Sequence, residues 1–389
     1  MSQTPWTELI ERIHASEHQL VIAVTGGGSK AISQLLDVAG ASRTVLEAVV
    51  PYASLSLEEW LGGTPEQFCS EPTARAMAMA AWMRARHLAP DAEARQLVGV
   101  GATASLATDR PKRGEHRVHV AVQTATHTAS CSWKLTKGRR NRKKEQWLAA
   151  KLILLAIGEA CDLDTAAACD ALDTQRLETE FLDPHTQEAE PSWTDILLGR
   201  KKCFVVPRPQ TGPAAAVQPK AVFPGAFNPP HSGHQRMAEI AVAKLGEPVA
   251  FELSITNVDK PSLDFVRLHE RISAFQQWDD TAKLILTAAP TFLEKAALFP
   301  GCTFVVGADT IARIAEPRYY DNSLAARDAA IGAIANHGCR FLVFGRHREG
   351  EFCSLADLGL PTELAALCGE VSEAEFSDEI SSTQLRREG

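Results

Sequence analysis

Apolar and polar positions alternate regularly along the second half of the chain. Five short runs rich in β-branched and aromatic residues have the length of strands: 221–223, 249–255, 284–287, 303–306 and 341–344. Stretches with helical periodicity lie between them, at 234–245, 264–278 and 324–335. Strands joined by helical crossovers form a doubly wound parallel sheet, whose ligands bind at the carboxyl ends of the strands. The pattern predicts a Rossmann-like α/β domain over residues 221–389.

The first half also mixes short apolar runs with helical stretches, which predicts a second α/β domain over residues 1–163. Predicted strands lie at 19–24, 97–100 and 118–122, and predicted helices at 31–38 and 144–160. Two domains suit a chain of 389 residues, since one hydrophobic core rarely organises so many. Residues 164–204 are interpreted as a mostly helical connector, and 205–220, with four prolines, as a linker.

Composition narrows the class of protein. The chain is 45% hydrophobic and 23% charged, with a net charge of -8, so it can form sizeable cores and does not attract nucleic acid or anionic membranes through its overall field. No apolar stretch approaches the length of about 20 residues that a membrane-spanning helix needs. The nine cysteines form no CxxC pair, which is typical of a reducing compartment. We expect a cytoplasmic protein with neither a membrane nor a nucleic-acid partner.

The motif with the clearest chemistry follows the first strand of the second half. The run PGAFNPPHSGH, residues 224–234, places a glycine turn before a predicted helix that begins near Ser232. Backbone N–H groups of such a turn can approach a phosphate closely, and His231 and His234, three residues apart, can face the same anion. An isolated HxGH is more often a capping or surface feature.

Three further motifs follow strands or open helices in the order that an α/β nucleotidyltransferase needs. A buried strand ends in Gly307 and Asp309, whose carboxylate can accept hydrogen bonds from ribose hydroxyls, and the strand FLVFGR ends in Arg346. The run ISSTQLR presents hydroxyls and a cation at a helix start, namely Ser381, Ser382, Thr383 and Arg386.

Together these motifs give the segment from Lys220 onward a resemblance to the nicotinate/nicotinamide mononucleotide adenylyltransferases of the HxGH nucleotidyltransferase superfamily. The resemblance implies Mg²⁺-dependent transfer of AMP from ATP to a mononucleotide, with no dedicated protein metal site. His231 and His234 would bind the triphosphate, with His234 nearest the α-phosphate, and Asp309 would hold a ribose. The remaining implied contacts to phosphate and nucleotide come from Lys260, Arg386, Gly225, Ala226, Phe227, Gly307, Arg346, Ser381, Ser382 and Thr383.

The sequence departs from that family at several positions. Pro224, Ala226 and Asn228 stand where the family has Gly, Thr and Asp, and Tyr319 and Tyr320 lie where a stacking Trp is common. The sequence therefore does not decide which molecule accepts the nucleotidyl group. A cytidylyl or other transferase for a different phosphorylated acceptor is one alternative, and a non-catalytic pyridine-nucleotide sensor is another.

The first half resembles the CinA C-terminal domain, whose active members are nicotinamide-mononucleotide amidohydrolases. Its TGG turn at residues 25–27 and its closing Gly-x-Arg helix carry the likeness. The family's nucleophilic Ser and catalytic Lys are absent where the motifs align, which implies a degenerate domain kept for binding, regulation or self-association; Ser29 and Lys30 as a displaced pair are the alternative. The glycines at 26–28 and at 99 and 101 are candidates for a phosphate cradle.

Two other patterns are interpreted as chance or as solvated surface. Residues 14–18 match HxxEH, a zinc motif, without an evident third ligand. The basic run KGRRNRKK, residues 137–144, could touch phosphates, but a solvated face at a strand-to-helix junction is the simpler interpretation.

Overall fold

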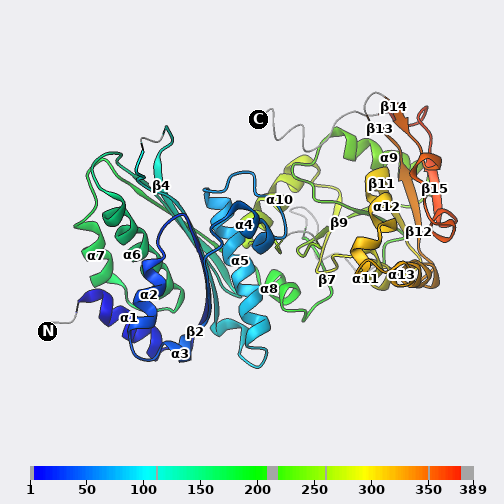
Figure 1. Ribbon diagram of the computed structural model, residues 1–389. Coiled ribbons are helices and arrows are strands. Elements are labelled where there is room, and N and C mark those ends of the chain that lie inside the picture. Colours follow the sequence, from blue (N-terminus) through cyan, green and yellow to red (C-terminus); the bar gives the residue numbers. More distant parts are fainter. Residues whose placement is uncertain (1–3, 111–112, 208–217, 259–260, 349–350, 378–389) are drawn as a thin grey trace. The chain divides into compact units, whose positions relative to one another are not determined.

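The computed structural model describes residues 4–110, 113–207, 218–258, 261–348 and 351–377. The chain forms two compact units. The first comprises Met1–Thr194 and Asp259–Arg267, and the second comprises Asp195–Val258 and Leu268–Gly389. Each unit is built on its own sheet with helices packed against it (Figure 1). The α/β class predicted from the sequence is therefore confirmed.

The strands of the first unit form a mixed sheet in the order β2-β1-β3-β4-β5-β6. Their bounds are β1 Gln19–Thr25, β2 Val45–Val49, β3 Leu97–Ser105, β4 His116–Gln123, β5 His127–Leu135 and β6 Leu182–Glu188. Strand β1 pairs in parallel with β2 and β3, whereas β3, β4, β5 and β6 pair antiparallel in succession.

Helices cover both faces of this sheet, with α1, α2, α6 and α7 on one face and α4 and α5 on the other (Figure 1). The bounds are α1 Pro5–Ala15, α2 Lys30–Asp37, α3 Ala41–Thr44, α4 Ser54–Leu61, α5 Glu71–Leu88, α6 Arg142–Ala160, α7 Ala166–Asp173 and α8 Pro191–Leu197. Within the described part of the chain, no helix is long and apolar enough to cross a membrane.

Two glycines of β3 allow α5 to lie directly on the sheet. A Cβ at Gly99 would lie 2.1 Å from the Ala78 carbonyl oxygen, and a Cβ at Gly101 would lie 2.2 Å from the Ala74 carbonyl oxygen. Any side chain at either position would clash with the helix backbone. These glycines therefore serve helix packing. Because they lie inside β3, paired with β1 and β4, they are not at a strand end where they could cradle a phosphate, contrary to the expectation.

The predicted connector at 164–204 is not mostly helical. It contains α7 and α8, but also β6, which completes the first sheet, and most of β7 Cys203–Val205, which pairs antiparallel with β10 Lys283–Thr287 in the second. Strand β6 is a mostly exposed edge strand with a proline, Pro184, so it lacks the apolar alternation that signals a strand. The predicted linker from 205 onward begins inside β7, and residues 208–217 lie outside the described part of the chain.

The strands of the second unit run in the order β15-β12-β11-β8-β9-β10-β7, all parallel except β7. The remaining bounds are β8 Ala221–Pro224, β9 Val249–Ser254, β11 Thr303–Gly307, β12 Arg340–Phe344 and β15 Cys368–Val371, with a hairpin of β13 Arg346–Arg348 and β14 Glu351–Cys353. The five strands predicted for this half are all present, within two residues of their predicted ends.

The strand order creates a topological switch point at β8, which is where doubly wound sheets form a ligand-binding crevice. Strand β8 lies between β9, the next strand along the chain, and β11, to which the chain returns after β10, so the sheet grows in opposite directions on the two sides of β8. Ligands of doubly wound sheets bind at such a switch point, outside the carboxyl ends of the strands. The helices of the unit are α9 Ser232–Leu245, α10 Phe265–Trp278 from Leu268 onward, α11 Phe292–Leu298, α12 Ala308–Ala315, α13 Leu324–Asn336 and α14 Thr362–Ala365.

Candidate active site

The turn after β8 is shaped by a glycine and a buried phenylalanine. The Gly225 N–H donates to the Glu252 carbonyl at 2.9 Å, which extends the pairing of β8 with β9. Phe227 has a φ of 43° and is only 2% exposed. A Cβ at Gly225 would lie 2.5 Å from the Phe227 ring, so glycine is needed for the ring to turn inward.

This geometry corrects one detail of the predicted phosphate grip. Because the Gly225 N–H is engaged by Glu252, it is not available to an acceptor phosphate. The N–H groups of Ala226 and Phe227 make no hydrogen bond within the described part of the chain, and Ala226 is exposed. Any backbone grip at this turn therefore falls to residues 226 and 227.

The two histidines of HSGH come together at the start of α9. His231 is the N-cap, and its backbone N–H donates to Nδ1 of His234 at 3.1 Å. The centroids of the two imidazole rings are 3.8 Å apart. Since Nδ1 of His234 accepts this bond, the proton of its neutral ring lies on Nε2, which can donate to a ligand.

The surroundings of His234 keep its ring neutral. Burial, and then the neighbouring His231, lower the pKa of His234 from 6.5 to about 3. The ring packs against the edges of aromatic neighbours, with centroids 5.2 Å from Phe227 and 5.9 Å from Phe223. Phe227 in turn contacts Phe251 and Phe275. At neutral pH the site therefore presents a fixed, uncharged donor at the end of β8.

The ends of β11 and β12 bring two other predicted residues together. Gly307 is the N-cap of α12, Asp309 lies in its first turn, and Arg346 follows β12. The Arg346 guanidinium and the Asp309 carboxylate form an ion pair. Both side chains are about half exposed, so the pair contributes little to stability and leaves them accessible to a ligand.

The two tyrosines considered as stacking residues have other contacts. The Tyr319 hydroxyl accepts from Arg313 at 3.0 Å and from Arg318 at 2.8 Å, and both guanidinium groups lie over its ring. The Tyr320 hydroxyl donates to the Ile314 carbonyl at 3.1 Å, and burial raises the Tyr320 pKa. Tyr320 is thus anchored to α12 in this structure.

Several predicted site residues lie outside the described part of the chain. They are Lys260, Ser381, Ser382, Thr383 and Arg386. Their roles stay predictions from the sequence.

Sequence reasoning missed a buried charge beneath the site. Glu252, in β9, is 1% exposed and accepts from the Lys295 ammonium at 2.7 and 2.8 Å and from the Thr287 hydroxyl. The same residue's carbonyl holds Gly225, so the ion pair fixes the strand against which the site turn is built. In the sequence, the one sign of this buried charge is a single glutamate inside the apolar run at 249–255.

Side chains from α6 occupy the hydrogen-bonding groups of the glycine turn in the first unit. The Gly28 N–H donates to Oε1 of Gln146 at 2.6 Å, and the Arg142 guanidinium donates to the Gly26 carbonyl at 3.1 Å. The Gly28 donor is therefore not free to bind a phosphate. The HxxEH motif is also structural, since Nε2 of buried His14 bonds the Leu35 carbonyl at 2.9 Å.

Comparisons with known proteins address the two units separately. Residues 222–388 match the cytidylyltransferase-like family model. A comparison with curated proteins found no match. Among solved structures, the competence/damage inducible protein CihA from Agrobacterium tumefaciens is similar, with 20% identity and a TM-score of 0.30, over 44% of this chain and 99% of that one.

Two further solved structures are similar to the chain. A CinA superfamily protein from Escherichia coli has 17% identity and a TM-score of 0.29, over 42% of this chain and 88% of that one. A CinA superfamily protein from Enterobacter cloacae has 14% identity and a TM-score of 0.29, over 45% and 95%. The family match and the parallel sheet together identify the C-terminal part of the chain as a cytidylyltransferase-like domain of the nucleotidyltransferase type.

Proposed function

We propose that the second unit transfers AMP from ATP to the phosphate of nicotinate or nicotinamide mononucleotide and releases pyrophosphate. An acceptor phosphate oxygen attacks the α-phosphorus of ATP while the bond from that phosphorus to the bridging oxygen of the β-phosphate breaks. The observation that carries the proposal is the placement of His234 at the switch point of the sheet, with its Nε2 proton directed by the bond at Nδ1. Donors preorganised in this way stabilise charge that develops on a phosphate.

Other residues have supporting roles in this proposal. His231 binds the triphosphate beside His234, the Ala226 and Phe227 N–H groups bind the acceptor phosphate, and Asp309 binds a ribose while paired with Arg346. From the sequence alone we assign phosphate and nucleotide contacts to a further set: Lys260, Ser381, Ser382, Thr383 and Arg386.

The two carboxylates at the site, Asp309 and Glu252, do not fit a protein-held Mg²⁺, because each is paired with a cation. Asp309 pairs with Arg346 and Glu252 pairs with Lys295. No group of three or more metal-ligating side chains occurs within the described ranges. We therefore treat Mg²⁺ as part of the ATP substrate, bound by its phosphate oxygens, and assign the protein no step through it.

Cytidylyl transfer to another phosphorylated acceptor is the second candidate. It is favoured by the cytidylyltransferase-like family match and by the departures at Pro224, Ala226 and Asn228. For the first unit we propose binding or self-association without amide hydrolysis, because the expected Ser and Lys are absent and Gln146 fills its glycine turn. A cytoplasmic location also stays a prediction.

The test is pyrophosphate release by the full chain with ATP or CTP, each crossed against both pyridine mononucleotides and a panel of phosphorylated alcohols. Release with ATP and a pyridine mononucleotide supports the proposal. Release with CTP and another acceptor supports the second candidate. Tight nucleotide binding without release from any pair would mean a nucleotide sensor and would contradict both.

A further inference from the structure

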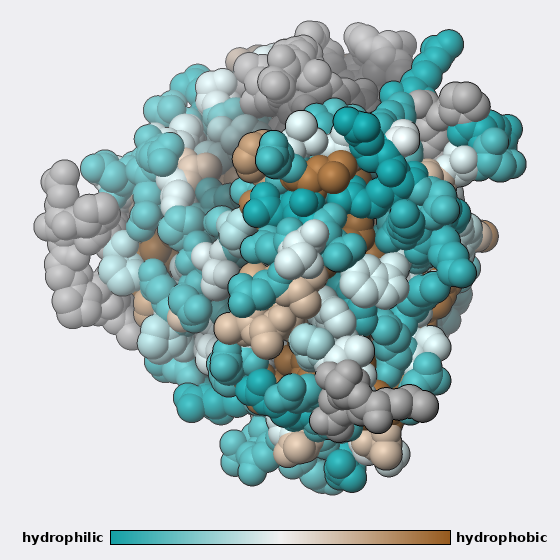
Figure 2. Space-filling model, turned by 90° about the vertical axis from the view of Figure 1, so that its left-hand side faces the viewer, coloured by the Kyte–Doolittle hydropathy of each residue, from teal (hydrophilic) through white to brown (hydrophobic). Residues whose placement is uncertain are grey.

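A cavity of about 1040 Å³ opens on the first unit, and none of its lining residues belongs to the proposed transferase site. Its walls are the start of α2, the loop between β5 and α6, the start of α6 and the segment after α7. Figure 2 views the chain from the side of these helices, where the surface is largely hydrophilic. The lining residues that the argument uses are Lys30, Arg139, Arg140, Lys143, Lys144 and Trp147.

The side chains that line this cavity carry a net positive charge, whereas the whole chain is negative. Five cationic side chains and one carboxylate, Glu178, line it, although the net charge of the protein is -8. Lys30, Arg139, Lys143 and Lys144 form no ion pair with any residue in the described ranges. Like charges that converge without counter-charges repel one another and focus a positive potential, which an anion would relieve.

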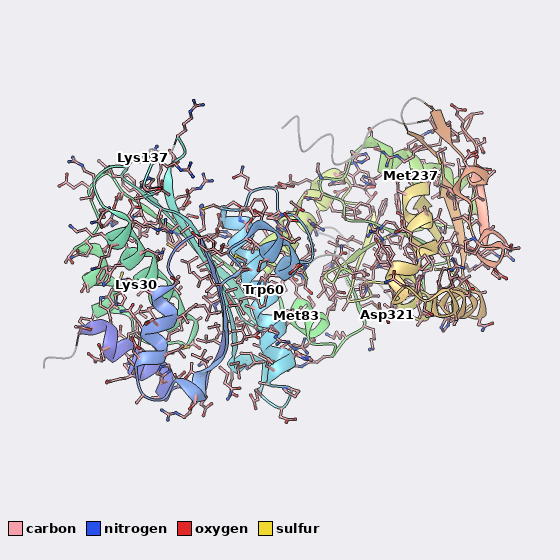
Figure 3. All side chains as sticks on the ribbon, in the orientation of Figure 1. Lys30, Trp60, Met83, Lys137, Met237 and Asp321 are labelled. Carbon is pink, nitrogen blue, oxygen red and sulfur yellow. The ribbon has the colours of Figure 1, made fainter. Side chains whose placement is uncertain are left out.

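Lys30 lines the cavity, whereas Lys137, although it belongs to the basic run at 137–144, does not. Figure 3 shows Lys30 at the start of α2 and Lys137 on the loop before α6. Lys137 does not line the cavity, and its ammonium donates to the Arg113 carbonyl at 3.2 Å. Lys137 is therefore engaged elsewhere, whereas Arg139, Lys143 and Lys144 are exposed, as a solvated face predicts, and also line the cavity.

A buried ion pair fixes two of the cavity walls. Glu180 is completely buried and accepts from Arg140 at 2.5 and 3.1 Å, from the Thr136 N–H at 2.7 Å and from the Leu177 N–H at 3.2 Å. Burial acts to raise the pKa of Glu180, but these hydrogen bonds outweigh it and leave the pKa lowered. Arg140 also donates to the Gln175 carbonyl. The loop before α6 and the segment after α7 are thus held at a set separation.

The cavity also has an apolar part. Trp147 and Leu177 line it, and the Trp147 ring is held by the edge of Trp6, with centroids 6.3 Å apart. The Lys151 ammonium lies 5.1 Å from the centroid of the Trp147 ring on the side of the core, where burial lowers the Lys151 pKa to about 8. Aromatic and aliphatic surface beside cations fits a ligand with both a phosphate end and a less polar end.

We propose that this cavity binds a small molecule that carries a diphosphate, such as a nucleoside diphosphate. At pH 7 the terminal phosphate carries about -1.5 to -2 charges and the inner one about -1. The total of about -3 matches the excess of the four unpaired cationic side chains over Glu178, since Arg140 is already paired with Glu180. This inference does not depend on the transferase proposal, because every residue that carries it belongs to the first unit.

The test is hydrogen exchange of the full chain with pyrophosphate, ADP, adenosine or no addition, read in peptides from residues 136–144 and 175–180. These peptides report this cavity and not the transferase site. Pyrophosphate and ADP should slow exchange in both segments, and adenosine should not. The Lys143→Glu variant should weaken the protection at least tenfold in ligand concentration, because a charge-assisted contact is replaced by repulsion.

Two further variants keep the test decisive. Lys143→Met removes the charge without introducing a carboxylate, and it should also weaken protection if Lys143→Glu folds poorly. Arg95→Glu is the matched control, because Arg95 precedes β3 while Lys30 follows β1, and these adjacent parallel strands place the two residues at opposite strand ends. Absence of protection with millimolar pyrophosphate, equal protection by adenosine, or protection unchanged in Lys143→Met would overturn the proposal.

Discussion

At the scale of single residues, His234 shows how a sequence motif acquires a defined chemistry. The spacing of HSGH places two imidazoles at one helix start, and the fold then sets the tautomer and charge of one of them. The His231 N–H fixes the Nε2 proton of His234, and Phe227 and Phe223 bury part of its ring. A neutral donor results, which can bind a phosphate oxygen over a wide range of pH.

The first prediction concerns the titration of this ring. The His234 ring should stay neutral down to about pH 4, because burial and His231 lower its pKa to about 3. Acidification from pH 6.5 toward 3 should favour the unfolded state, in which the histidine binds the proton more readily. In His231→Asn the pKa of His234 should rise but stay below 6.5, since burial is the larger cause. NMR titration of the assigned ring measures both values; a His234 pKa near 6.5 in the wild type would contradict this environment.

At the scale of elements, the ends of four strands set up the site. Strand β8 leads into the glycine turn and α9, β9 anchors that turn through Glu252, and β11 and β12 deliver Asp309 and Arg346 to neighbouring positions. The buried pair of Glu252 with Lys295 joins β9 to α11. Breaking such a pair leaves an uncompensated buried charge.

The second prediction tests that pair. Lys295→Met should lower the free energy of unfolding by about 3–5 kcal/mol. Adding Glu252→Gln should recover at least half of the loss, since the buried charge is then removed and Thr287 keeps an acceptor. The matched control is Lys220→Met, which breaks the exposed pair with Glu247 and should cost less than about 1 kcal/mol. Urea unfolding measures all three; equal losses for the two Lys→Met variants would show that burial of the pair does not matter.

At the scale of the whole molecule, the chain joins a nucleotidyltransferase-type domain to a mixed-sheet α/β unit. In the first unit, the Gly28 N–H, which could bind an anion, is engaged by Gln146, and Gly99 and Gly101 serve the packing of α5. Side chains and helices of the unit itself therefore determine the conformation of these glycines.

The third prediction follows from that arrangement. The full chain should release no ammonia from nicotinamide mononucleotide, because residues 23–25 contain no serine where the resemblance places the nucleophile. Ammonia release should remain at the level of a blank without protein, and Ser29→Ala should change nothing. Ammonia release that disappears in Ser29→Ala would make Ser29 a nucleophile and the chain a bifunctional enzyme.

The sequence predicted the parts of this molecule that depend on local pattern. Five strands of the second unit are short apolar runs, and their order along the chain placed the functional motifs at strand ends. Strands β6 and β7 were missed because edge strands need only one partner and tolerate polar residues and proline. The pair of Glu252 with Lys295 joins residues 43 positions apart, which no local pattern reveals.

The measurement that tests the central claim most directly is the turnover of His234→Ala with the nucleotide pair that the wild type uses. Loss of one preorganised donor at the α-phosphate should lower kcat about 100-fold or more while the melting temperature changes little. The exposed His337→Ala variant of the same unit should keep wild-type turnover. A folded His234→Ala protein within threefold of wild-type kcat would contradict the assignment of this site.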